Sequence, residues 1–217
     1  MNKRRTKVSV KPFGRGALFI VSGPSGVGKT TLCQKLSSSV SHLKHSVSYT
    51  TRPPRKCEIN NVHYTFIDKK KFKTMIDKRE FAEWAVVHGN FYGTSAKKLA
   101  EICKTGYDII LDIDTQGATQ MKRKYEDAVY IFILPPSMKI LEKRLRARMS
   151  ELTMGIKTRI DRAKGEIANY KNYGYIVVNR DLKKALGEIK AIVTAQRLRT
   201  AKVDPKWLKI LKIKSQN

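Results

Sequence analysis

Short apolar runs alternate with amphipathic segments along most of the chain. Continuous apolar runs predict strands buried on both faces, and they occur at 17–21, 107–113, 129–134 and 175–179. Apolar residues at helical spacing predict helices, which we place at about 29–41, 95–105, 138–145, 157–169 and 182–198. Strands that alternate with helices in this way favour an α/β fold with a parallel sheet flanked by helices on both faces.

The segment 46–95 has a different texture. It contains Pro53-Pro54, a short alternating stretch at 62–67 and many aromatic residues, and Phe72, Met75 and Ile76 fit one face of a short helix. We therefore expect a small mixed subdomain inserted into the main fold. The predicted organisation is a basic arm (1–15), a core (16–45 and 96–200) interrupted by the insertion (46–95), and a basic tail (201–217).

Charge and cysteine content narrow the class of protein. The 217 residues include 45 Lys and Arg against 18 Asp and Glu, a formal net charge of +27 that favours polyanionic ligands such as nucleotides, nucleic acid or anionic membrane. No apolar run approaches the about 20 residues of a membrane-spanning helix, and no apolar stretch follows the basic N-terminus as in a secretory signal. Cys33, Cys57 and Cys103 lack metal-ligand spacing and fit free thiols in a reducing cytoplasm.

The sharpest motif lies between the first predicted strand and the helix that follows it. The sequence GPSGVGKT matches G-x-x-x-x-G-K-[ST], a loop whose backbone N–H groups surround nucleotide phosphates. The residues expected to bind ATP here are Gly23, Pro24, Ser25, Gly26, Val27, Gly28, Lys29 and Thr30. This loop is compatible with GTPases, transporter ATPases, helicases and small-molecule kinases, although the length leaves little room for a motor.

Other charged residues suggest how a second substrate could bind. Asp112 and Asp114 end a predicted strand, where carboxylates can orient Mg²⁺ or accept hydrogen bonds from a substrate, or simply cap a helix. Arg52 and Arg55 stand beside prolines and suit a doubly charged phosphate. Glu83 can accept two hydrogen bonds, as the N1–H and 2-amino edge of guanine requires. Taken singly, Arg52, Arg55 and Glu83 are each more often solvated surface groups.

In combination, six stretches resemble the guanylate kinase family over about residues 16–200. They are SGPSGVGKTTL, VSYTTRPPR, HGNFYGTS, ILDIDTQGA, FILPPS and IVVN, in this order. The resemblance implies the P-loop nucleoside monophosphate kinase fold and Mg²⁺-dependent, reversible transfer of the γ-phosphoryl group of ATP to GMP. It also implies an enzyme in three parts: a core, a small mixed GMP-binding subdomain and a helical lid at about 144–165.

The resemblance also assigns roles residue by residue. The implied contacts to the GMP phosphate are Ser48, Arg52, Arg55, Tyr64 and Tyr92, with Glu58 matching an acid of the same stretch, and the guanine would be read by Glu83, Thr94 and Asp114. Thr30 and Asp112 would lie at the metal, and Asn179 at the adenine. Lys29, Arg148 and Arg159 would stabilise the transferring phosphoryl group.

Two alternatives to a cytoplasmic kinase remain open at this stage. Related domains in scaffold proteins use the GMP cleft to hold phosphopeptides, although this chain keeps Lys29, Thr30, Arg148 and Arg159. The stretch 206–214 could form a basic amphipathic helix for RNA or anionic membrane, or be a solvated tail. The family usually has glycine at the positions of Cys57, Asn61, Ala147 and Met149, which concerns loop and lid flexibility.

Overall fold

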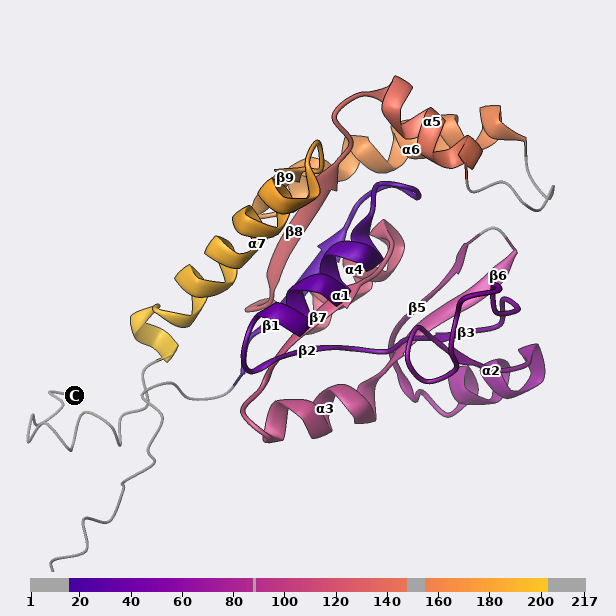
Figure 1. Ribbon diagram of the computed structural model, residues 1–217. Coiled ribbons are helices and arrows are strands. Elements are labelled where there is room, and N and C mark those ends of the chain that lie inside the picture. The colour runs from indigo at the N-terminus through magenta and orange to yellow at the C-terminus, as the bar shows by residue number, and fades with distance from the viewer. Residues whose placement is uncertain (1–15, 88, 148–154, 203–217) are drawn as a thin grey trace, which may run out of the picture.

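A five-stranded parallel sheet forms the centre of the molecule (Figure 1). The computed structural model describes residues 16–87, 89–147 and 155–202. The strand order is β2-β7-β1-β8-β9, with bounds β1 Leu18–Ser22, β2 Leu43–His45, β7 Asp108–Asp112, β8 Val129–Leu134 and β9 Tyr175–Val178. The predicted parallel sheet and its four apolar strands are confirmed, whereas β2 was not predicted.

Helices cover both faces of this sheet and bury its apolar side chains. On one face, α1 (Lys29–Ser39) and α7 (Leu182–Arg197) pack against β1, β7, β8 and β9. On the other, α3 (Ala96–Lys104) and α4 (Thr115–Lys124) pack against β1 and β7. Because β1 contributes to both layers, its residues 19–21 are completely buried. Burial on both faces explains the unbroken apolar run of this strand.

A second, four-stranded sheet is built from the segment between β2 and α3. Its order is β4-β3-β6-β5, with bounds β3 Tyr49–Thr50, β4 Thr65–Phe66, β5 Phe81–Val87 and β6 Asn90–Ser95. The predicted short helix is α2 (Lys69–Asp77), which buries Phe72 and Met75. Phe72 stacks on Phe81 of β5, with 4.4 Å between ring centroids, so the helix and the sheet share a small core.

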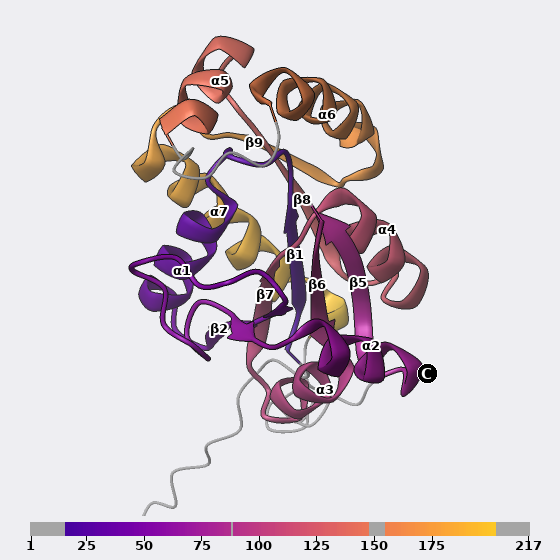
Figure 2. The same ribbon diagram turned by 90° about the vertical axis from the view of Figure 1, so that its right-hand side faces the viewer.

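Two further helices lie together at the opposite end of the molecule from α2 and α3 (Figure 2). α5 (Met138–Ala147) and α6 (Ile156–Ala168) share a core of Leu141, Leu145 and Ala163. Short 3₁₀ turns follow α6 at Asn169–Asn172 and α7 at Thr200–Lys202. In the part of the chain that the structure describes, no helix is long and apolar enough to cross a membrane.

Side chains of α4 tie the second sheet to the central one. Gln120 donates from Nε2 to the Trp84 carbonyl at 2.6 Å and accepts from the Trp84 N–H at 3.2 Å. Lys124 donates to the Ala82 carbonyl at 2.6 Å. Both acceptors belong to β5, so this strand is held against α4 by hydrogen bonds to its backbone. The sequence did not predict α4, because its ten residues include Gly117 and mostly polar side chains.

At the amino end of the central sheet, where β1 and β7 begin, one carboxylate links neighbouring segments of the chain by hydrogen bonds. Asp108 accepts from the Ala17 backbone N–H and from Arg197 Nε, each at 2.6 Å. Arg197 in turn donates to the Ser41 carbonyl at 2.8 Å. The start of β1, the start of β7, the end of α7 and the loop after α1 thus meet at Asp108, which is 7% exposed.

We expect Asp108→Asn to destabilise the protein by about 2 kcal/mol, because it weakens a buried ion pair and turns one acceptor into a donor. The measurement is urea unfolding of the full chain. Asp127→Asn makes the same charge change at an exposed position, so its midpoint should match the unmutated protein. Equal midpoints for the two variants would show that Asp108 is not an anchor.

Candidate active site

The phosphate-binding loop lies between β1 and α1, at the carboxyl edge of the central sheet. Gly26 and Gly28 adopt positive φ angles of 83° and 101°. A Cβ at Gly28 would lie 2.6 Å from Asn179 Nδ2, so this position requires glycine for space as well as for conformation. The loop curls and presents backbone N–H groups and the N-terminus of α1 to one region, as anion binding requires.

Asn179 and Arg144 hold this loop in place. Asn179, just after β9, donates from Nδ2 to the Val27 carbonyl at 2.8 Å. Arg144 of α5 donates to the Asn179 carbonyl at 3.0 Å and to the Val27 carbonyl at 3.4 Å. Val27 itself is completely buried in the core. The loop is therefore anchored at Val27, in its middle, by Asn179 after β9 and by Arg144 of α5.

Lys29 points back into the loop. Its Nζ donates to the Gly23 carbonyl at 2.6 Å and to the Pro24 carbonyl at 3.2 Å. Burial lowers the pKa of Lys29, although the nearby carboxylates of Glu166 and Asp112 act in the opposite direction. A desolvated ammonium at this point is well suited to a phosphate, which would offer it a charged partner in place of carbonyls.

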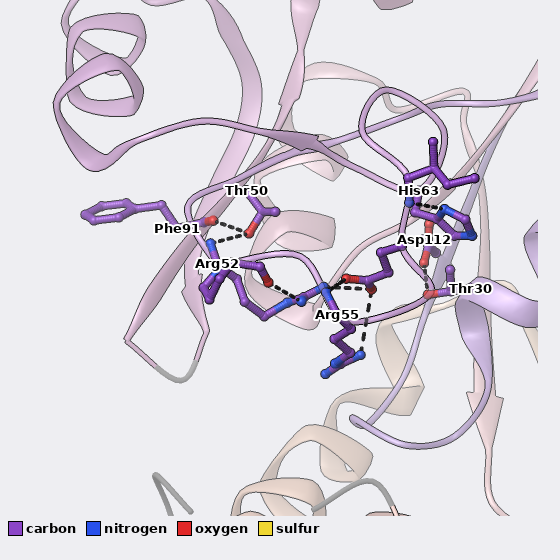
Figure 3. Close-up of polar contacts among 10 residues, drawn as sticks. Thr30, Thr50, Arg52, Arg55, His63, Phe91 and Asp112 are labelled. Atoms are coloured by element: carbon purple, nitrogen blue, oxygen red, sulfur yellow. Dashed lines mark hydrogen bonds and ion pairs between the residues drawn. The ribbon is translucent and has the colours of Figure 1, made fainter. Parts of the chain in front are cut away.

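Thr30 and Asp112 meet where the loop passes the end of β7. Thr30 Oγ1 donates to Asp112 Oδ2 at 2.5 Å, the contact drawn in Figure 3. A hydroxyl and a carboxylate are the oxygen donors that Mg²⁺ prefers, and Mg²⁺ usually takes one or two protein ligands besides phosphate and water. Among the described residues, no group of three or more His, Cys, Asp or Glu could enclose a metal. The donor set at this edge therefore fits Mg²⁺ carried with a nucleotide.

Two arginines of the second sheet region are brought together by one carboxylate. Glu58 accepts from Arg52 Nη2 at 2.9 Å and from the Arg55 backbone N–H at 2.8 Å. The Arg55 side chain is 62% exposed, with its Nη1 3.9 Å from the same carboxylate, while Arg52 lies over the Tyr64 ring at 5.6 Å. Figure 3 shows Arg52 and Arg55 beside each other on the side of the site opposite Thr30 and Asp112. Glu58 thus holds both arginines in place.

Two carboxylates, those of Glu83 and Asp114, lie where β5 meets the start of α4. Glu83 is 4% exposed, and its Oε1 accepts from Thr94 Oγ1 at 2.5 Å. Burial raises the pKa of Glu83 to about 7, and the nearby charge of Asp114 adds to the rise, while the Thr94 hydrogen bond opposes it. Asp114 caps α4 by accepting from the Gly117 N–H at 2.8 Å, so the helix-capping alternative is part of its role.

One cavity connects these features. The predicted site residues that line it are Gly23, Ser25, Gly26, Gly28, Lys29, Thr30, Ser48, Arg52, Arg55, Tyr64, Glu83, Tyr92, Asp112, Asp114 and Arg159. Five others are not at its wall: Pro24 and Val27 of the loop, and Glu58, Thr94 and Asn179, which hydrogen-bond to other residues of the site. Arg148 lies outside the described residues.

Arg159 and Glu166 complete the cavity from α6. Arg159 Nε is buried and has no hydrogen-bond partner among the described residues, so this N–H can donate to an anion in the cavity. Glu166 lines the same cavity and accepts from Arg162 Nε at 3.1 Å, but the sequence analysis missed it. Seven residues separate it from Arg159, which is two helical turns, and this spacing could have identified it.

A phosphate loop, a Thr–Asp pair suited to Mg²⁺ and a facing arginine pair define a P-loop nucleoside monophosphate kinase. A family model described as guanylate kinase matches residues 15–196. Guanylate kinases of Geobacter metallireducens and Geobacter sulfurreducens are 53% and 50% identical over 188 residues, each covering 87% of this chain and 93% of the relative. The crystal structure of guanylate kinase from Anaplasma phagocytophilum matches with a TM-score of 0.73 at 32% identity, over 93% of this chain and 95% of that one.

The chain belongs to the guanylate kinase family, which catalyses ATP-dependent phosphorylation of GMP. It is an enzyme, a nucleoside monophosphate kinase, as the resemblance implied. The α/β fold with its parallel sheet is confirmed by the same comparison.

Gly117 packs against Glu83, so we expect this position to tolerate no side chain. A Cβ there would overlap Glu83 Oε2, so Gly117→Ala should displace the carboxylate. We expect the KM for GMP to rise about tenfold or more, because small misplacements at a binding site are costly, while the KM for ATP changes less than about twofold. Gly187→Ala, at a helical glycine with open space around it, is the matched control for steady-state kinetics. Unchanged GMP kinetics in Gly117→Ala would contradict a role of the Glu83 carboxylate in GMP binding.

The raised pKa of Glu83 predicts that the contribution of this residue to the stability of the ligand-free protein falls as the pH rises. Its carboxyl titrates at 4.5 in the unfolded chain and at about 7 in the folded one. Between these two pH values, Glu83 is protonated in the folded protein and ionised in the unfolded chain. The free energy of unfolding of the unmutated protein should therefore fall by about 3 kcal/mol relative to that of Glu83→Gln between about pH 4.5 and pH 7.5. Urea unfolding across this range measures the difference, and a constant difference would refute the prediction.

Proposed function

We propose that GMP binds in the cavity between the second sheet and the phosphate loop, with ATP on the loop itself. The loop supports the ATP side through its backbone and through Lys29. The GMP side is supported by charge, because Arg52 and Arg55 can hold a dianionic phosphate while Glu83 and Asp114 accept from a base. The two substrates would then meet with their phosphates between two sets of cations.

The observation that carries the base assignment is the pair of carboxylates at the cavity wall. Guanine presents N1–H and a 2-amino group as donors, which match Glu83 and Asp114, whereas adenine presents an acceptor at N1. Glu83 is buried, and its carboxyl would gain these donors in place of water. Thr94 and Ser48 lie behind it, with 3.2 Å between their hydroxyl oxygens, and would keep Glu83 oriented.

Phosphoryl transfer would need no protein nucleophile in this arrangement, because an oxygen of the GMP phosphate would attack the γ-phosphorus of ATP in line. The bond between this phosphorus and the β,γ-bridging oxygen would break, and ADP would leave with the bridging oxygen. The side chains would position both phosphates and stabilise the charge that spreads over the transferring group. Lys29 and Arg159, which both line the cavity, would do this, and Arg148 stays a prediction of the same kind. Mg²⁺ held by Thr30 and Asp112 would supply additional positive charge on the ATP phosphates.

The domain roles follow from the same proposal. The segment 46–95 would be the GMP-binding part and about 144–165 the lid, and lid closure over the phosphates would exclude water. Glu58, Thr94 and Asn179 would act as positioning residues behind the wall. We place the reaction in the cytoplasm as a step of purine nucleotide metabolism that recycles GMP, since no disulfide joins Cys33, Cys57 or Cys103 within the described residues. Contact of 1–15 and 201–217 with RNA or membrane stays a prediction.

A screen of acceptor nucleotides tests the proposal. With MgATP and GMP, dGMP, AMP, UMP or dTMP, coupled detection of ADP should give kcat/KM for GMP at least about a hundredfold above that for AMP. Glu83→Gln should lower kcat/KM for GMP by about a hundredfold, because its amide nitrogen faces a donor of the base. Glu80→Gln, an exposed acid next to β5, is the control and should leave the kinetics unchanged.

Three results would count against specific parts of the proposal. Equal turnover of AMP and GMP would remove the roles of Glu83 and Asp114. GMP binding without GMP-dependent ADP release would favour the phosphopeptide-binding module. Loss of GMP turnover in Glu80→Gln would mean that the Glu83 effect is not specific.

A further inference from the structure

Both oxygens of the Asp112 carboxylate are occupied by side chains from different elements. Oδ2 accepts from Thr30 of α1, as described above. Oδ1 lies 2.6 Å from Nε2 of His45, the last residue of β2. The side chains of His45 and Asp112 are 9% and 8% exposed, so this contact is shielded from water. His45 belongs to no motif of the sequence analysis and does not line the cavity.

Strand pairing explains why His45 reaches Asp112. In the parallel pairing of β2 with β7, His45 lies opposite Ile110. Asp112 is two residues further along β7, so its side chain leaves the sheet on the same face as that of Ile110. The Ser46 N–H donates to the Ile110 carbonyl at 3.0 Å and extends the pairing past β2. The pairing with β7 therefore holds the backbone of His45 in place and directs its side chain toward Asp112.

The short distance between His45 Nε2 and Asp112 Oδ1 requires a hydrogen between the two atoms. An ionised carboxylate can only accept hydrogen bonds, and Oδ2 already accepts from Thr30. Nε2 of His45 then carries the hydrogen between the two atoms. A carboxylate fixed at Oδ1 has one orientation left for Oδ2.

We propose that His45 is a positioning residue for Mg²⁺: by donating from Nε2 to Oδ1, it fixes the Asp112 carboxylate with Oδ2 beside the Thr30 hydroxyl. This inference rests on the proposed function, in which Thr30 and Asp112 face the metal. Residues that orient a metal ligand typically change metal affinity by about 10- to 100-fold when they are replaced. Because His45 touches neither the arginine pair nor Glu83, its replacement should leave GMP binding unchanged.

The test compares variants of the full chain that keep or lose the donor. His45→Leu removes it, His45→Gln places an amide N–H close to the position of Nε2, and His45→Asn is too short to reach Asp112. The readout is the Kd of Mn²⁺, measured by electron paramagnetic resonance with a non-hydrolysable ATP analogue bound. We expect His45→Leu and His45→Asn to weaken Mn²⁺ binding about tenfold and His45→Gln to stay within about threefold of the unmutated protein.

A double-substitution cycle separates action through Asp112 from a general effect. If His45 works through this carboxylate, His45→Leu should weaken Mn²⁺ binding no further in an Asp112→Asn background. Calorimetry of GMP binding, with each variant confirmed as folded by its thermal transition, should give the same Kd for all His45 variants. If His45→Leu does not fold, the comparison of Gln with Asn carries the same test.

Several results would overturn the proposal. They are an unchanged Mn²⁺ Kd in His45→Leu and His45→Asn, a Gln variant as weak as the Asn variant, or full additivity with Asp112→Asn. Failure of the unmutated protein to bind GMP would instead refute the proposed function, because GMP binding does not involve His45. The two failures are therefore distinguishable.

Discussion

The parallel pairing of β1 with β7 is the interaction on which the rest of the molecule depends. In this register Val21 lies opposite Asp112, so the phosphate loop that follows β1 and the carboxylates that end β7 leave the sheet at the same edge. Parallel neighbours cannot be joined by a tight turn, and the chain must make an excursion between them. The second sheet is built within that excursion. The fold thus brings the second sheet, with Glu83, to the phosphate loop through a single pairing.

Polar side chains that do not line the cavity hydrogen-bond to residues of the site. Glu58 accepts from the Arg52 side chain and the Arg55 backbone N–H, Thr94 donates to Glu83, and Asn179 donates to the loop. Hydrogen bonds of this kind matter because an unpaired polar atom in the interior is costly. Glu83 still carries a cost, because its burial raises its pKa to about 7 and so disfavours its charged form. The protein keeps this unfavourable charge where a base with donor groups would relieve it.

The sequence predicted what depends on local pattern and little of what depends on long-range pairing. Buried strands, the loop and most helices carry a period or a motif within a few residues. β2 is only three residues long, and α4, although Asp114 can cap it, contains Gly117 and mostly polar side chains, so neither carries a clear apolar pattern. The side chains of Glu83 and Asp114 suggested acceptors for a substrate, but only the family resemblance placed them at one site, because their proximity depends on α4 packing against β5. His45 and Gly117 matter only through residues far away in sequence.

The hydrogen bonds of Gln120 and Lys124 to β5 have a consequence for the protein at high concentration. β5 is an edge strand, and the free backbone groups of an edge strand can pair with a strand of another molecule. The Gln120 amide occupies the N–H and carbonyl of Trp84 as a neighbouring strand would, and Lys124 takes the Ala82 carbonyl. The other edge, β4, has only two residues. At Ala82 and Trp84, this edge of the second sheet is thereby covered against pairing with another molecule.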